Sequence, residues 1–133
     1  MFHVIYLHIN PKKTGALRIM GRMSREKGKR GEREACKALS DALGGLYRRS
    51  VQYCGRGGDA DIEGLSGLSI EVKRAERFNL YSALEQALQD KLPGESPIVL
   101  HRRNGKPWVM VCYVQDMKEV SDAILKERDR TGD

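Results

Sequence analysis

Acidic and basic residues alternate with aliphatic ones in the segment 68–73 (LSIEVK). Successive side chains of a strand point to opposite faces, so Glu71 and Lys73 share one face, about 7 Å apart. A carboxylate beside an ammonium group suits cation binding and the stabilisation of developing negative charge. Glu-x-Lys is a common tripeptide, however, and a solvated sheet face with both side chains in water remains the alternative.

A second carboxylate is predicted to face this pair. Residues 60–64 and 68–73 form two predicted strands joined by a three-residue turn. This turn places Asp61 directly opposite Glu71, whereas a turn one residue longer or shorter would not. Facing carboxylates repel each other and destabilise a β-ladder. A divalent cation, with Lys73 nearby, is the simplest compensation.

A third carboxylate comes from a predicted helix over residues 27–43. At about 100° per residue, Cys36, Leu39 and Leu43 fall within about 40° of Glu32, so Glu32 lies in the apolar stripe. A buried carboxylate is unfavourable unless it is paired or metal-bound. The alternative is that Glu32 lies in the first helical turn, where acids complement the helix dipole.

The elements that must position these residues follow in the order helix, three strands, helix, two strands, helix. This pattern predicts one α/β layer domain. The first helix ends at Gly44-Gly45, a glycine loop lies at 55–58, and Asn79 and Asp116 are predicted N-caps of the two later helices. The predicted strands are 46–53, 60–64, 68–73, 97–102 and 107–114, the last two forming a hairpin around Asn104-Gly105.

Composition agrees with a single globular domain. The chain has 133 residues, of which 40% are hydrophobic and 32% charged, a balance typical of folded proteins. Its three cysteines and three histidines lack zinc-ligand spacing, which predicts a reduced cytoplasmic protein without structural zinc. Neither an apolar run of about 20 residues nor a signal peptide is recognisable, so no membrane association is expected.

The first 22 residues differ from the rest, with a β-prone run at 2–9 followed by Pro11. We interpret residues 1–22 as an N-terminal extension and residues 23–133 as the domain, with Met23 a candidate for the true start. A mature N-terminus at Met1 in mass spectrometry of the native protein would contradict that start.

The net charge of +6 is unevenly distributed. Clustered cations suit a polyanionic partner, because each neutralised phosphate releases counterions; a merely basic surface is the alternative. The basic clusters are Arg22, Arg25, Lys27, Lys29, Arg30 and Arg33; Arg48, Arg49 and Arg56; Lys73, Arg74 and Arg77; and Arg102, Arg103 and Lys106.

Four segments together resemble a known family. KGKRGEREA, GRGGDADIEG, LSIEVKRAE and the helical ALEQ at 83–86 are similar to the archaeal and viral Holliday-junction resolvases of the PD-(D/E)XK superfamily, over roughly residues 25–114. The resemblance implies a restriction-endonuclease-like core, with a central mixed sheet of about five strands flanked by helices. It also implies a homodimer that nicks four-way DNA junctions symmetrically, in the cytoplasm of a bacterial or archaeal cell or encoded by a virus.

The resemblance extends to individual site residues. Glu32 matches the helix-borne acid, Asp61 the motif aspartate, Glu71 and Lys73 the Glu-x-Lys pair, and Gln86 the glutamine of the following helix. It implies a Mg²⁺ ion, replaceable by Mn²⁺, held by Asp61, Glu71 and the Val72 backbone carbonyl. Glu32 would bind metal-bound water or a second ion, and Lys73 would position the attacking water or stabilise charge on phosphorus.

The sequence departs from the family in two places. Asp59 stands two residues before Asp61, and the hairpin count selects Asp61. The stretch between Arg48-Arg49 and the motif aspartate is longer than usual in the family, which affects the match of the basic residues there.

The sequence therefore predicts a Mg²⁺-dependent endodeoxyribonuclease acting on four-way junctions, without a small-molecule cofactor. Two alternatives stay open: a PD-(D/E)XK nuclease specific for flaps, ends or duplex DNA, and a DNA-binding module that has lost catalysis. The predicted DNA contacts, each alternatively plain surface charge, are Lys27, Lys29, Arg30, Arg33, Arg48, Arg49 and Arg56.

Overall fold

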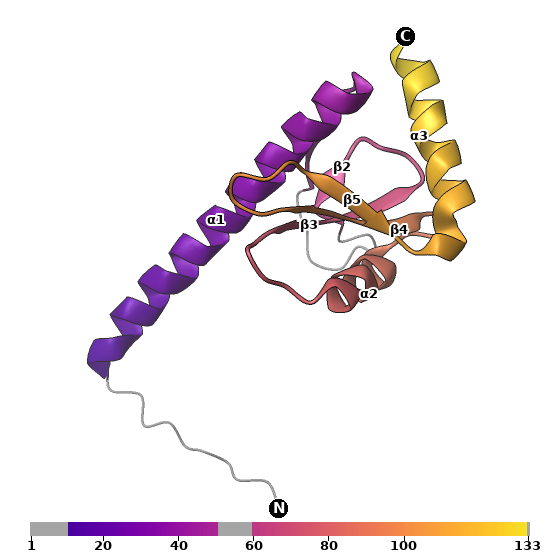
Figure 1. Cartoon of the computed structure of the whole chain (residues 1–133). Coiled ribbons are helices and arrows are strands. Elements are labelled where there is room, and N and C mark those ends of the chain that lie inside the picture. Colours follow the sequence, from indigo (N-terminus) through magenta and orange to yellow (C-terminus); the bar gives the residue numbers. More distant parts are fainter. Residues whose placement is uncertain (1–10, 51–59, 133) are drawn as a thin grey trace, which may run out of the picture.

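The computed structural model describes residues 11–50 and 60–132, and this part of the chain is α/β, with three α-helices and two small β-sheets (Figure 1). The predicted order of helix, three strands, helix, two strands and helix is confirmed. The elements are α1 (Pro11–Leu43), β1 (Arg48–Arg49), β2 (Ile62–Glu63), β3 (Leu68–Arg74), α2 (Leu80–Asp90), β4 (Ser96–Arg102), β5 (Val109–Cys112), the 3₁₀ turn η1 (Val114–Asp116) and α3 (Met117–Thr131).

Helix α1 is longer than the sequence pattern predicted. It begins at Pro11 instead of near Lys27 and runs for 33 residues, so its first half extends beyond the sheets (Figure 1). Proline is favoured at the first helical position because its fixed φ angle suits the helix and its missing N–H has no partner there. The predicted extension is thus continuous with the first helix from Pro11 onward, whereas the β-prone run 2–9 lies outside the described residues. Within the described residues, no helix is both long and apolar enough to cross a membrane.

The strands form a two-stranded sheet, in which β1 and β2 are antiparallel, and a three-stranded sheet in the order β3-β4-β5. β3 and β4 are parallel, with α2 as the crossover that parallel strands require, and β4 and β5 form the predicted antiparallel hairpin. The predicted hairpin ladder between 60–64 and 68–73 was wrong: β2 pairs with β1. A backbone hydrogen bond of 2.8 Å from Asp61 N to Ile70 O links the two sheets instead.

Helices cover both faces of the three-stranded sheet. Leu68 and Ile70 of β3 belong to the larger core, which also contains residues of α1, β4 and α3. Ser69 points the other way, and its hydroxyl donates to the Ala87 carbonyl of α2 at 3.0 Å. The smaller core on this face joins α2 to Val99 of β4. The alternation along β3 therefore directs Glu71 to the α2 face, as the sequence pattern predicted for the polar residues.

A glycine lets α1 cross β3 closely. Gly31 is buried, and a Cβ atom added to it would lie 2.6 Å from the Cβ of Arg74. Any larger residue would therefore push α1 away from the sheet. By contrast, a Cβ added to Gly28, one turn earlier in the same helix, would meet nothing within 4 Å. The close crossing fixes the position of the next residue, Glu32, relative to the end of β3.

Candidate active site

Asp61 and Glu71 lie side by side, as predicted. They are not paired in a regular ladder; instead, the side chain of Asp61 contacts the β3 backbone next to Glu71. The Asp61 Oδ2 atom accepts a hydrogen bond of 2.8 Å from Val72 N, while Asp61 N donates to Ile70 O. Asp61 therefore forms hydrogen bonds with the two β3 residues that flank Glu71. Glu71 itself is 7% exposed. Two carboxyl groups are thus held together in a largely buried place.

The two acids carry an unfavourable charge pair. Burial first, and then the charge of Glu71, raise the pKa of Asp61 to about 7, although the Val72 N–H opposes the increase. Burial likewise raises the pKa of Glu71, against the opposing effect of Lys73. A hydrogen bond from the Asp61 carboxyl favours the ionised form of Glu71. Ionisation of either carboxyl group therefore disfavours ionisation of the other, because two buried, adjacent carboxylates repel each other.

Lys73 lies on the same face of β3 as Glu71, as the period-two pattern predicted. Its Nζ atom is 3.3 Å from Glu71 Oε1, and its side chain remains 38% exposed. The ammonium group lowers the pKa of both Asp61 and Glu71. It therefore partly compensates the acidic pair while staying accessible to a ligand from solvent.

Glu32 joins this group from α1. It lies well inside the helix, so the first-turn alternative was wrong. Its side chain is 21% exposed, and its Oε2 atom forms an ion pair of 2.5 Å with Arg49 Nε. The charge of Glu32 also raises the pKa of Asp61, which brings all three predicted acids into one electrostatic cluster. Arg49, predicted to contact DNA, thus compensates the helix-borne acid in this structure.

Sequence reasoning missed Asp90, the last residue of α2. Its charge raises the pKa of Glu71, and its Oδ2 atom accepts a hydrogen bond of 2.8 Å from Gln86 Nε2. Gln86 is exposed, and its hydrogen bond to Asp90 links it to the site. An acid in the last helical turn opposes the helix dipole, and this unfavourable placement was the signal that could have indicated Asp90.

The donor chemistry of the cluster suits a hard divalent cation. Such ions prefer oxygen ligands, and Asp61 and Glu71 provide two adjacent carboxyl groups. A cation would also relieve the repulsion that raises the two pKa values. Among the described residues, no three His, Cys, Asp or Glu side chains converge as a ready-made ligand set. Asp61 and Glu71 are therefore the pair of carboxyl groups that this site offers to a cation.

The predicted DNA contacts divide between free and paired side chains. Lys27 and Arg33 on α1 are exposed. Arg30 pairs with Glu34 at 3.3 Å, and Arg48 with Glu63 at 3.3 Å. Lys29, also on α1, pairs with Glu26 at 3.4 Å. Residues outside the described ranges include Arg56, the glycine loop 55–58, Asp59 and Cys54.

No family model matches the chain, and no significant match was found among curated proteins or solved structures. The candidate site is therefore identified from the positions and contacts of its own residues. The structure brings Glu32, Asp61, Glu71 and Lys73 together from α1, the segment before β2, and β3.

Proposed function

We propose that this protein is a Mg²⁺-dependent endodeoxyribonuclease with a restriction-endonuclease-like core, which cuts four-way DNA junctions. The observation that carries the proposal is the convergence of Asp61 and Glu71, both with raised pKa values, beside Lys73. A protein that only bound DNA would need cations and would gain nothing from two buried acids in contact.

The arrangement of the strands supports the proposed core. The Asp61–Ile70 hydrogen bond connects the two small sheets, which gives the spatial order β1-β2-β3-β4-β5 with both parallel and antiparallel neighbours. Helices α1 and α2 lie on opposite faces of the three-stranded part. This linkage of the two sheets, together with the helices on both faces, supports the proposal of a helix-flanked mixed sheet of about five strands.

In the proposed mechanism, Asp61, Glu71 and the Val72 carbonyl would hold Mg²⁺, or Mn²⁺ in its place. The bound ion would polarise a phosphoryl oxygen and make a water molecule more acidic. Both carboxyl groups must be deprotonated to serve as ligands. Since the pKa of Asp61 is about 7, cation binding and activity should rise with pH through neutrality.

The remaining groups act on the phosphodiester itself. Hydrolysis adds a water oxygen to phosphorus and breaks one P–O ester bond, with negative charge building up on the phosphoryl oxygens. The Lys73 ammonium group, held 3.3 Å from Glu71 Oε1, stabilises this charge or orients the water. Glu32 accepts hydrogen bonds from water on the α1 side of the site, with Arg49 balancing its charge.

A homodimer with two such sites would cut two strands symmetrically. The exposed cations of α1, including Lys27 and Arg33, would contact the phosphate backbone.

The decisive experiment compares cleavage of a labelled four-way junction with cleavage of a linear duplex of the same sequence, with Mg²⁺ or with EDTA. Glu71→Gln tests the site, and Glu85→Gln, an exposed position on α2, is the matched control. We expect paired nicks on the junction alone, lost with EDTA and in Glu71→Gln but kept in Glu85→Gln. Equal cutting of linear DNA would instead favour a nuclease with another substrate. Tight binding without cutting under Mg²⁺ or Mn²⁺ would leave only a DNA-binding module.

A further inference from the structure

A second charged cluster lies on the opposite flank of α1 from Glu32. The Glu34 carboxylate contacts three guanidinium groups: Arg30 Nε at 3.3 Å, Arg74 Nε at 3.1 Å and Arg102 Nη1 at 3.6 Å. Arg74 and Arg102 are register partners at the ends of the parallel strands β3 and β4. We call Arg30, Arg74 and Arg102 the arginine cluster.

Two members of the cluster, Arg74 and Arg102, are held by the hairpin between β4 and β5. Arg74 Nη2 donates to Asn104 Oδ1 at 2.7 Å, and Arg102 Nε donates to the Lys106 carbonyl at 2.6 Å. Asn104 N in turn donates to Glu76 Oε1 at 2.6 Å. The side chain of Arg74 is 18% exposed and that of Arg102 is 32% exposed. Guanidinium groups fixed in this way lose little side-chain entropy when an anion binds.

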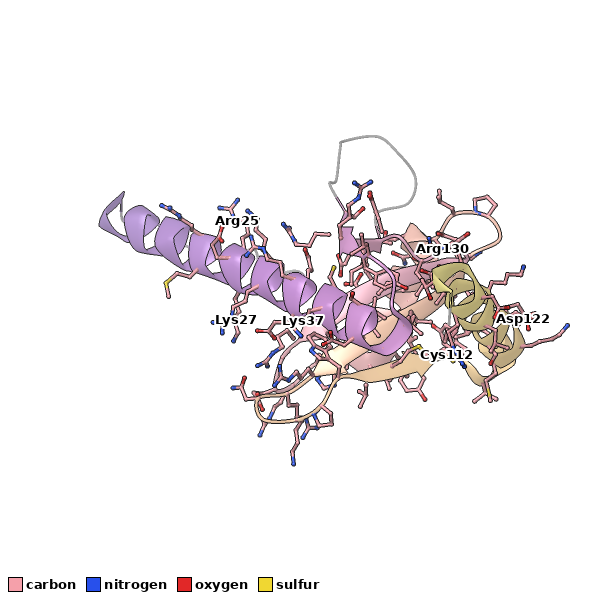
Figure 2. All side chains as sticks on the ribbon, turned by 90° about the horizontal axis from the view of Figure 1, so that it is seen from above. Arg25, Lys27, Lys37, Cys112, Asp122 and Arg130 are labelled. Carbon is pink, nitrogen blue, oxygen red and sulfur yellow. The ribbon has the colours of Figure 1, made fainter. Side chains whose placement is uncertain are left out.

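The surroundings of the cluster have an excess of positive charge. Two carboxylates, Glu34 and Glu76, lie among five cations, because the hairpin adds Arg103 and Lys106, which are both exposed, to the arginine cluster. Arg25 and Lys27 project from opposite sides of the part of α1 that extends beyond the sheet (Figure 2). The acidic residue Asp122 lies far from them on α3 (Figure 2). A polyanion is thus attracted to this end of the molecule.

We propose that the arginine cluster, together with Arg103 and Lys106, binds the phosphate backbone of DNA. In the free protein, Glu34 occupies the position that a phosphate would take among the guanidinium groups. The inference rests on the proposed function for the identity of the polyanion. Lys73 and Arg74 are consecutive on β3 and point to opposite faces of the sheet, so the carboxylate site and the arginine cluster lie at the same end of this strand.

The proposal predicts effects of opposite sign for two charge changes. Glu34→Gln removes the competing carboxylate and should increase DNA affinity severalfold. The double variant Arg103→Ala/Lys106→Ala should decrease affinity, and the slope of log K against log salt should fall by about 2, since each phosphate contact contributes about 0.9. The matched controls on α3, Glu119→Gln and Lys118→Ala/Lys126→Ala, remove the same charges from exposed positions and should leave both quantities unchanged.

Binding is measured by fluorescence anisotropy with a labelled four-way junction in EDTA, over a series of salt concentrations. Because Arg103 and Lys106 lie on an exposed hairpin tip, their replacement should not affect folding; urea unfolding checks this for Glu34→Gln. If both variants behave like their controls, the inference is overturned, even if the wild-type protein cuts DNA. Wild-type cleavage with Mg²⁺ tests the proposed function separately, so the two failures are distinguishable.

Discussion

Replacing Asp61 by Asn should stabilise the metal-free protein above neutral pH. Burial and the charge of Glu71 raise the pKa of Asp61 from 3.8 to about 7. At about 1.4 kcal/mol for each pKa unit, ionising Asp61 destabilises the folded state by about 4 kcal/mol. Asn carries no charge and retains an oxygen that can accept the hydrogen bond from Val72 N. We expect Asp61→Asn to gain about 2 to 4 kcal/mol at pH of about 8, the lower figure allowing for local relaxation.

The sign of the pH dependence follows from the direction of the pKa change. The folded protein binds more protons than the unfolded chain between pH of about 4 and 7, so its stability falls as pH rises through this window. Glu71, whose pKa is also raised, contributes in the same direction. The difference between wild type and Asp61→Asn should therefore be small near pH of about 4 and reach its full value above pH of about 7.

Urea unfolding in EDTA at acidic and alkaline pH measures this difference directly. Mg²⁺ should narrow this difference above neutrality by up to about 2.7 kcal/mol, the stabilisation that a ligand at 100 times its Kd provides, because Asp61→Asn lacks a cation ligand. An Asp61→Asn variant that is less stable than wild type by the same amount at both pH values would refute the reasoning. It would mean that Asp61 is a structural hydrogen-bond acceptor without electrostatic strain.

Three further predictions test the positions around the site. Gly31→Ala should destabilise the protein by about 1 to 3 kcal/mol in urea unfolding, because its Cβ would lie 2.6 Å from the Cβ of Arg74 on β3. The control Gly28→Ala places its Cβ in open space and should instead stabilise the protein by up to about 1 kcal/mol. Equal effects of the two substitutions would contradict the close crossing of α1 and β3. Tyr47→Phe removes a hydrogen bond of 2.8 Å to the buried Glu127. It should lower the free energy of unfolding by about 1 to 2 kcal/mol, and with it the melting temperature. An unchanged melting temperature would show that this hydrogen bond does not stabilise the fold. Lys73→Met should reduce the single-turnover cleavage rate by about 10² to 10³, and a rate close to wild type would remove Lys73 from the mechanism.

Local patterns in the sequence determined the order of the elements and the polar face of β3. Period-two alternation separated Glu71 and Lys73 from the aliphatic residues, and Asn79 was correctly predicted as a cap, because its side chain accepts a hydrogen bond from Ser82 N at 3.0 Å. Asn104-Gly105 likewise indicated the β4–β5 hairpin. These features depend on neighbours in the chain, so the residues alone specify them.

Only the tertiary structure decided how β1, β2 and β3 pair and which charges meet. The sequence pattern paired 60–64 with 68–73, whereas β2 pairs with β1 and a side-chain hydrogen bond brings Asp61 to Val72 N. A short strand has several partners of similar local energy, and packing against the core selects among them. Ion pairs such as Arg49–Glu32, and the approach of Asp90 to Glu71, join residues distant in sequence. No periodicity encodes them, because they follow from how α1, α2 and the strands pack.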